Sequence, residues 1–242
     1  MYNLLIGFYN ILPGHDLGIA VIAVTILIRV LLYPLSLKSI KAQKMMQDIQ
    51  PKIEEVKRKY ANNKEKQAAE TMRLYREEKV NPFSSCLPLL LQLPFLIALF
   101  HVLRSVTDSA SLSILYPFMQ NPGSVNAVGL LGMVDLSKAN LIIAILAGAA
   151  QFWQGHMLLL KRPPVRNTAT KDEDFSVLVN QQMTYIMPVL TIFIARTLPA
   201  GVSLYWFVST LLLAGQQWLI FHKKNTTKPY DDSPRETSPS AG

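Results

Sequence analysis

The chain has little of what metal, redox and nucleotide chemistry requires. Its 242 residues include one cysteine, Cys86, and four scattered histidines, which excludes an internal disulfide and the common zinc, haem or iron–sulfur spacings. It has no GxxxxGK[ST] phosphate loop. No Ser/His/Asp set suggests a nucleophile. We therefore expect a protein that is not an enzyme and holds no cofactor and no metal.

The chain also has few charged residues. Only 17% of the residues are charged and half are hydrophobic, whereas about 25% of an average soluble domain is charged. This composition excludes a disordered chain and argues against an ordinary soluble enzyme. The charge is also unbalanced, because 24 Lys and Arg stand against 16 Asp and Glu, a formal net charge of +8. Such an excess is typical of nucleic-acid-binding proteins or of membrane proteins with asymmetric loops.

Five long apolar stretches favour the membrane. A helix needs about 20 apolar residues to cross a hydrocarbon core of roughly 30 Å. We therefore predict an all-α integral membrane protein with five transmembrane helices. The predicted spans are residues 17–37, 82–104, 140–160, 181–197 and 200–221.

The basic residues orient these spans. Residues 38–79 carry twelve Lys or Arg, and residues 161–179 and 222–242 carry four each. The other side has only Arg104, Lys138 and Arg196. Because positive charge concentrates in cytoplasmic loops, the N-terminus is predicted outside and the C-terminus in the cytoplasm. This topology accounts for most of the net charge, so no direct nucleic-acid binding is predicted.

The segments between the spans have patterns of their own. Residues 1–16 are apolar and aromatic but too short to span, which predicts an interfacial helix on the outer face. Residues 105–139 are expected to be an outer loop and residues 161–180 a cytoplasmic loop. The polar, Pro/Ser-rich tail at 222–242 is predicted to be disordered.

Residues 38–79 carry two apolar stripes at helical spacing on either side of residues 61–63. Asn62 precedes Glu65 by three residues, a pattern like a capping box. We predict an antiparallel cytoplasmic helical hairpin, with a solvated linker as the alternative. The stripe residues are Met45, Ile49, Ile53, Val56 and Tyr60, then Ala68, Met72 and Tyr75.

Arg29 is the most informative residue, because it lies inside the first predicted span. It precedes Leu37 by eight residues, about 12 Å at 1.5 Å per residue. An unpaired arginine at such depth costs roughly 2.5–3.5 kcal/mol, and none of the five predicted spans contains Asp or Glu. We therefore expect Arg29 to face a hydrated, positively charged cavity. The alternative is that helix-end carbonyls and lipid phosphates hold it.

Uncharged polar residues are expected to line this cavity. Thr25 lies one turn before Arg29 on the same helix face, and each later span contains glutamine. Each of them alone is more often a contact between helices than a functional residue. The candidates are Thr25, Gln92, Gln151, Gln154, Gln181, Gln182, Thr184, Ser203, Gln216 and Gln217.

Two motifs follow Arg29 in a specific order. Residues 81–95 are NPFSSCLPLLLQLPF, and residues 198–220 are LPAGVSLYWFVSTLLLAGQQWLI. With the Arg-bearing first span and the basic hairpin, they resemble the YidC/Oxa1/Alb3 family of membrane-protein insertases over about residues 1–225. The resemblance implies a five-helix core around a hydrophilic groove open to the cytoplasm and to lipid, with Arg29 as its charge. It also implies groove positions at Thr25 and Gln92, and a substrate-contacting aromatic at Trp206.

This resemblance implies a function. A protein of this kind inserts and folds nascent membrane proteins into the bacterial plasma membrane, with or without the Sec translocon. Nascent chains and the lipid bilayer are the expected partners, with the ribosome and the translocon as further candidates. The chain departs from the family at Thr210, where asparagine is frequent, and in its weakly basic tail. The alternative functions are a small-solute transporter or channel, and a purely structural scaffold.

Overall fold

The computed structural model describes residues 1–81, 87–106, 115–159 and 185–222. Within these ranges the chain is helical apart from one pair of two-residue strands, as the sequence predicted. A helix without a label covers Tyr185–Ala195. The labelled elements are α1 (Tyr2–Ile11), α2 (Leu17–Leu31), α3 (Tyr33–Asp48), α4 (Gln50–Lys59), α5 (Lys64–Glu77), α6 (Leu87–Ser105), β1 (Val128–Gly129), β2 (Val134–Asp135), α7 (Leu141–Leu159) and α9 (Ala200–His222).

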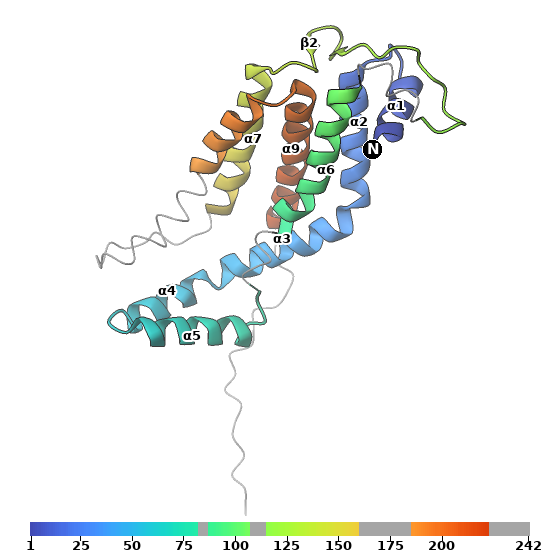
Figure 1. Cartoon of the computed structure of the whole chain (residues 1–242). Coiled ribbons are helices and arrows are strands. Elements are labelled where there is room, and N and C mark those ends of the chain that lie inside the picture. The colour runs from blue at the N-terminus through green and yellow to red at the C-terminus, as the bar shows by residue number, and fades with distance from the viewer. Residues whose placement is uncertain (82–86, 107–114, 160–184, 223–242) are drawn as a thin grey trace, which may run out of the picture.

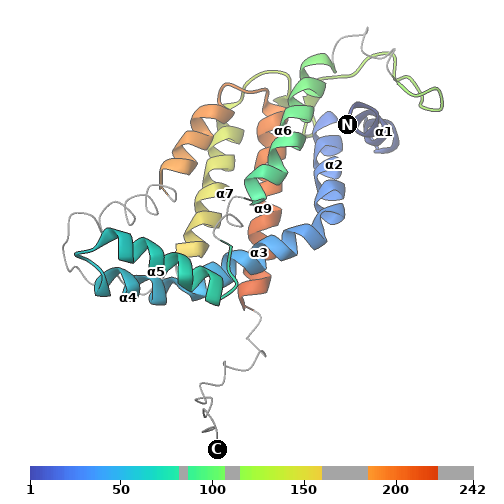
Figure 2. The ribbon, with the colours of Figure 1, turned by 60° about the horizontal axis from the view of Figure 1, so that its bottom comes forward.

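The helices α2, α6, α7 and α9 and the Tyr185–Ala195 helix form a bundle in which α9 is central (Figure 1). α9 packs most extensively against α7 and also contacts α2, α6 and α3. Both helices contain fully buried alanines, Ala144 and Ala147 in α7 and Ala214 in α9, and small residues let helix backbones approach. α1 lies at one end of the bundle, and α3, α4 and α5 extend from the other (Figure 2).

A sharp bend separates α2 from α3. The two helical segments Leu17–Leu31 and Tyr33–Lys59 meet at 68°. Pro34 lies in the first turn of α3 and has no N–H to donate to the carbonyl of residue 30, so the helical ladder breaks there. The predicted straight span over 17–37 is therefore interrupted. Arg29 lies two residues before the end of α2, and the 12 Å depth estimated for a straight helix does not apply.

The helices α3, α4 and α5 form the predicted hairpin, with α4 packed against α5. Its small core contains Ile49 and Ile53, both assigned to the stripe, together with Val80. Three stripe residues are wrongly placed, because Met45 and Met72 are about half exposed, at 46% and 51%, and Ala68 is exposed as well. The apolar side of a short amphipathic helix covers less than half its circumference, so a stripe residue at its edge stays in solvent.

The cap of α5 also differs from the prediction. The N-cap is Asn63, whose side chain accepts a hydrogen bond from the N–H of Lys66 at 3.0 Å. The helix therefore begins one residue later than a cap at Asn62 would allow. Both asparagines suit an N-cap, and only the turn geometry selects between them.

At the opposite end of the bundle, the carboxylate of Asp16 joins two distant segments. Its oxygens accept from the N–H groups of Gly18 and Ile19 in the first turn of α2, and from Leu130 and Leu131 between the two strands. Burial raises the pKa of Asp16, but these four backbone donors outweigh burial and leave the pKa below its usual value.

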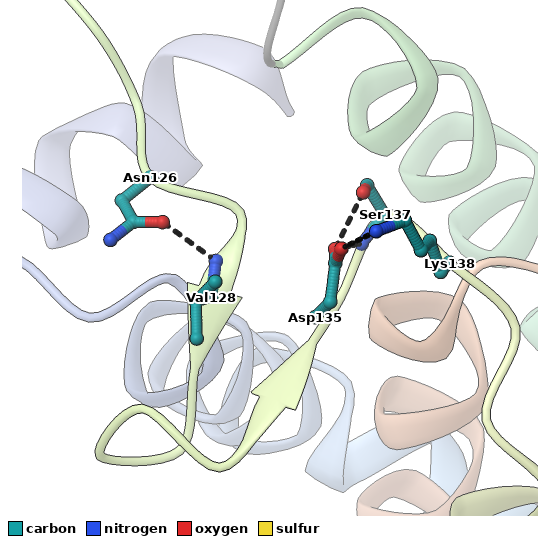
Figure 3. Close-up of polar contacts among 5 residues, drawn as sticks. All are labelled: Asn126, Val128, Asp135, Ser137 and Lys138. Atoms are coloured by element: carbon teal, nitrogen blue, oxygen red, sulfur yellow. Dashed lines mark hydrogen bonds and ion pairs between the residues drawn. The ribbon is translucent and has the colours of Figure 1, made fainter.

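The strands β1 and β2 pair antiparallel beside this carboxylate. Side chains hold the start of β1 and the end of β2, which lie at the same end of the pair because Val128 is opposite Asp135 (Figure 3). The Asn126 side chain accepts from the N–H of Val128 at 2.9 Å, and the Asp135 carboxylate contacts Ser137 and Lys138. The hydrogen bond from Lys138 and those from Ser137 lower the pKa of Asp135 to about 2. The described part of the expected outer loop at residues 126–138 is therefore locally well structured.

Length and composition identify one described helix, α9, as able to cross a membrane, and the bent pair of α2 with Tyr33–Lys59 is a second candidate. Three apolar helical segments are shorter. They are Leu90–Ser105 within α6, Leu141–Met157 within α7, and the Tyr185–Ala195 helix. The number of spans and their boundaries stay predictions. The predicted cytoplasmic loop and tail, and parts of the second and fourth predicted spans, lie outside the described residues.

Candidate functional site

Arg29 is buried, with 9% of its surface exposed. Its guanidinium donates from Nε to Ser209 Oγ at 2.9 Å and from Nη2 to Gln92 Oε1 at 3.0 Å. Both partners are uncharged, and none of the ion pairs among the described residues includes Arg29. Among the described residues, this interior positive charge is therefore held by hydrogen bonds that it donates to neutral groups.

The two partners of Arg29 also contact each other. Gln92 Nε2 donates to Ser209 Oγ at 3.0 Å. One polar cluster thus joins α2, α6 and α9, which contribute Arg29, Gln92 and Ser209 respectively. Because Gln92 is only partly buried, the cluster borders on space that another group can enter.

That space is a cleft bounded by α2, α3, α6 and α9. Its cavity volume is about 10 Å³, which is room for about one water molecule. The described structure therefore has a narrow cleft at Arg29, where the sequence predicted an open hydrated cavity. The lining residues are Ile28, Arg29, Leu32, Ser36, Ser39, Leu91, Gln92, Phe95, Tyr205 and Leu213.

The described residues contain no cluster of three or more His, Cys, Asp or Glu side chains that suits a metal ion. The arrangement at Arg29 is suited to electrostatics and hydrogen bonding. It offers one fixed positive charge, an amide and a hydroxyl, enclosed by apolar side chains such as Phe95 and Leu213. Charge in such surroundings acts more strongly than in water, because the local dielectric constant is lower.

A family model described as "60Kd inner membrane protein" matches residues 8–228. The chain belongs to this family, the YidC/Oxa1 family. A Fusobacterium nucleatum member named membrane protein insertase YidC is 36% identical over 229 residues, which cover 92% of this chain and 98% of the relative. A Clostridium tetani member of the same name is 34% identical over 204 residues, which cover 84% of this chain and 81% of the relative.

A solved structure supports the same assignment. The chain matches a structure described as an active YidC insertase with its first transmembrane domain resolved, at a TM-score of 0.53 and 26% identity. The match covers 86% of this chain and 42% of the solved one. The helical bundle of the YidC/Oxa1 family is thus present in this chain, which spans less than half of that larger relative.

The structure brings together two of the predicted groove residues, Arg29 and Gln92. Thr25 is fully buried, but its hydroxyl donates to the carbonyl of Val21 at 2.6 Å, within its own helix. The remaining described candidates do not line the cleft: Trp206, Gln151, Gln154 and Gln216 are partly buried, and Ser203 and Gln217 are fully buried. Gln181 and Gln182 lie outside the described residues. Their roles as groove residues stay predictions.

Several cleft residues were missed by the sequence reasoning. Ser209 is the main acceptor for Arg29, and Tyr205, one turn earlier on α9, lines the cleft. Ser36 and Ser39 line it from α3. A serine in a helix is too common to be informative by itself. The usable signal was Pro34, which predicts the bend that turns α3, with both serines, toward the bundle.

Proposed function

We propose that this chain is a membrane protein insertase, which receives polar segments of nascent membrane proteins in the cleft at Arg29. Its family and the names of its relatives support this function. The observation that carries the mechanism is a buried guanidinium with only neutral hydrogen-bond partners among the described residues. Such a charge is available to an incoming carboxylate without first breaking an ion pair.

The magnitude of this attraction is sufficient to matter. A carboxylate 8 Å from Arg29 gains about 2 kcal/mol at an effective dielectric constant of about 20. That corresponds to roughly 30-fold in an equilibrium constant at 1.4 kcal/mol for each factor of ten. The cleft thereby favours acidic segments that have to reach the outer face. Partitioning of apolar substrate helices into lipid supplies the remaining driving force.

The proposed topology has five spans, with the N-terminus outside and the C-terminus in the cytoplasm. It is supported by the twenty basic residues in the segments on the cytoplasmic side. Cysteines introduced at Lys138 and Lys64 test it. A thiol reagent that cannot cross the membrane labels Lys138→Cys from outside and Lys64→Cys only after the vesicles are opened. The reverse pattern refutes the orientation.

Nascent membrane-protein chains are the proposed substrates, and the bacterial plasma membrane is the proposed location. The ribosome and the Sec translocon are candidate partners. The alternative of a small-solute transporter or channel is disfavoured by the family and by the names of the relatives. Solute flux through the purified protein that Arg29→Ala abolishes would favour that alternative.

The test of the mechanism is insertion into vesicles that contain the purified protein. Two substrates are compared that differ only in whether the outer segment is acidic or neutral. We expect Arg29→Ala to lower insertion of the acidic substrate by roughly 10- to 30-fold and that of the neutral one much less. Arg29→Lys keeps the charge and is the matched control. Equal loss for both substrates, or no loss for either, refutes the role of the charge.

A further inference from the structure

The buried face of α3 is polar. Its buried residues are Ser36, Ser39, Ile40, Gln43 and Gln47, which recur at the spacing of one helix face. A helix packed against a bundle normally buries apolar residues on that face. Here Ile40 is the only apolar member, and it packs in a small separate cluster with Leu213 and Phe221 of α9.

Several of these polar atoms have no partner. The hydroxyls of Ser36 and Ser39 are each 3% exposed, yet neither has a hydrogen bond among the described residues. Helical hydroxyls commonly donate to a carbonyl one turn earlier, as Thr25 does here. Buried polar groups without a partner are destabilising, so these two hydroxyls lower the stability of the described structure.

A glutamine on α9 continues the same surface. Gln217 is fully buried and donates from Nε2 to Gln43 Oε1 at 3.0 Å, but its own Oε1 has no partner among the described residues. Ser36 and Ser39 lie on the wall of the cleft that contains Arg29. Gln217 follows the cleft residue Leu213 by one turn of α9. An uncharged polar surface thus leads from Arg29 along α3 toward the end of α9.

We propose that Ser36, Ser39, Gln43 and Gln217, here called the α3 strip, bind the main chain of an extended polypeptide segment. This inference rests on the proposed insertase function and assigns it a second contact surface. Hydroxyl and amide groups both donate and accept hydrogen bonds, as do the N–H and C=O groups of a peptide. They do not distinguish one side chain from another, which suits a protein whose substrates differ in sequence.

The dimensions of the strip fit this ligand. From Ser36 to Gln43 is seven residues of helix, about 10.5 Å at 1.5 Å per residue. An extended chain rises about 3.3 Å per residue, so the strip spans roughly three substrate residues. The bend at Pro34 and the small contact of α3 with α9, made through Ile40 and the Gln43–Gln217 hydrogen bond, would let α3 shift and admit the chain. Arg29 then selects for acidic charge, and the strip holds the neighbouring backbone.

Disulfide crosslinking of the full-length protein in vesicles tests the contact. Cys86→Ser removes the native thiol, and single cysteines are placed at Ser36 or Ser39, a nearly isosteric change. Lys41→Cys, on the exposed face of α3, is the matched control. A stalled nascent chain carries one cysteine in its polar segment. We expect disulfides at positions 36 and 39 and none at position 41.

Phe95→Cys, elsewhere in the same cleft, separates the two proposals. Crosslinks at position 95 without crosslinks at positions 36 and 39 overturn the α3 strip and leave the insertase function intact. An absence of insertion by the wild-type protein overturns the proposed function itself. Crosslinks at position 41 equal to those at 36 and 39 show only nonspecific proximity and also overturn the strip.

Replacing both hydroxyls tests whether they act beyond structure. Because Ser36→Ala and Ser39→Ala remove unpaired buried groups, the double variant is expected to unfold at a higher temperature than the wild type. Insertion of a neutral polar segment is expected to fall by roughly 3- to 10-fold for each hydroxyl. Ser203→Ala is the control, because its hydroxyl already donates to the carbonyl of Ala195. Unchanged insertion by the double variant means that water alone fills the strip, and refutes the proposal.

Discussion

Replacing Arg29 with methionine is predicted to leave the fold as stable as before, or more stable, while insertion of acidic segments is lost. Methionine has a similar length but no charge. Removing a buried cation relieves a desolvation penalty of several kcal/mol. The hydrogen bonds lost to Gln92 and Ser209 are worth about 1.5–3 kcal/mol each. Gln92 and Ser209 remain bonded to each other at 3.0 Å, so the change leaves no new unpaired group.

The expected net effect on the free energy of unfolding is between zero and about 3 kcal/mol of stabilisation. The assay is equilibrium unfolding in one fixed detergent, followed by circular dichroism. Ser209→Ala provides a double-mutant cycle. In the wild-type background, Ser209→Ala removes a hydrogen-bond acceptor from the buried charge and is expected to lower the free energy of unfolding by about 1.5–3 kcal/mol. In the Arg29→Met background it is expected to cost less than about 1 kcal/mol.

Destabilisation of the Arg29→Met protein by more than about 1 kcal/mol would refute this reasoning. Arg29 would then be a structural residue that holds α2, α6 and α9 together. Equal effects of Ser209→Ala in both backgrounds would show that the hydroxyl stabilises α9 without reference to the charge. Either result would remove the reason for treating the buried charge as functional.

Three further predictions concern the scaffold. The pKa of Asp16 is lowered in the folded protein, so its stabilisation is present above the unfolded pKa of about 3.9 and is lost as pH falls through the folded value. Asp16→Asn should therefore lower the free energy of unfolding at pH 7 by about 1–3 kcal/mol. In denaturation curves recorded at decreasing pH, the variant should also lose less of this free energy than the wild type. Asn63→Ala should cost about 1 kcal/mol and speed hydrogen exchange in the first turn of α5, whereas Asn62→Ala should change neither; the opposite result would place the cap at Asn62. Gly148→Ala should lower the thermal unfolding midpoint, because a Cβ there meets the side chain of Ile192 and lies 3.0 Å from the carbonyl of Pro188; an unchanged midpoint would mean that the Tyr185–Ala195 helix is free to shift.

Much of the fold was predictable, because it depends on local patterns. The helix at residues 1–16 and the hairpin of α3, α4 and α5 follow from apolar spacing and length. The boundaries were less accurate, since Asn62 and Asn63 are chemically equivalent as caps. Asp16 immediately before an apolar run is a visible N-cap signal. Its bonds to Leu130 and Leu131 join residues 114 and 115 positions away, a contact that local patterns do not report.

The candidate site was predictable only in part, and for a similar reason. Arg29 stands out because a charge within an apolar stretch is rare, and Gln92 because it lies in a specific motif. Ser209 is 180 positions from Arg29, and nothing in its neighbourhood distinguishes it from a serine that contacts lipid or another helix. The narrowness of the cleft was also hidden, because it depends on how far α3 turns inward at Pro34.

The narrow cleft and the buried polar groups lead to one conclusion about how the site works. Among the described residues Arg29 has only neutral partners, and the cleft hydroxyls of Ser36 and Ser39 have none, while the free space admits about one water molecule. A cavity that stayed permanently filled with water would satisfy these groups and give an incoming peptide little advantage. Groups that are closed off and poorly paired gain more binding free energy from a substrate. The carboxylates and amides of the substrate then form hydrogen bonds that were missing, whereas in a hydrated site they would only replace hydrogen bonds to water. We therefore expect α3 to be mobile at Pro34 and the site to open to its substrate, with the unpaired groups as the source of the binding free energy.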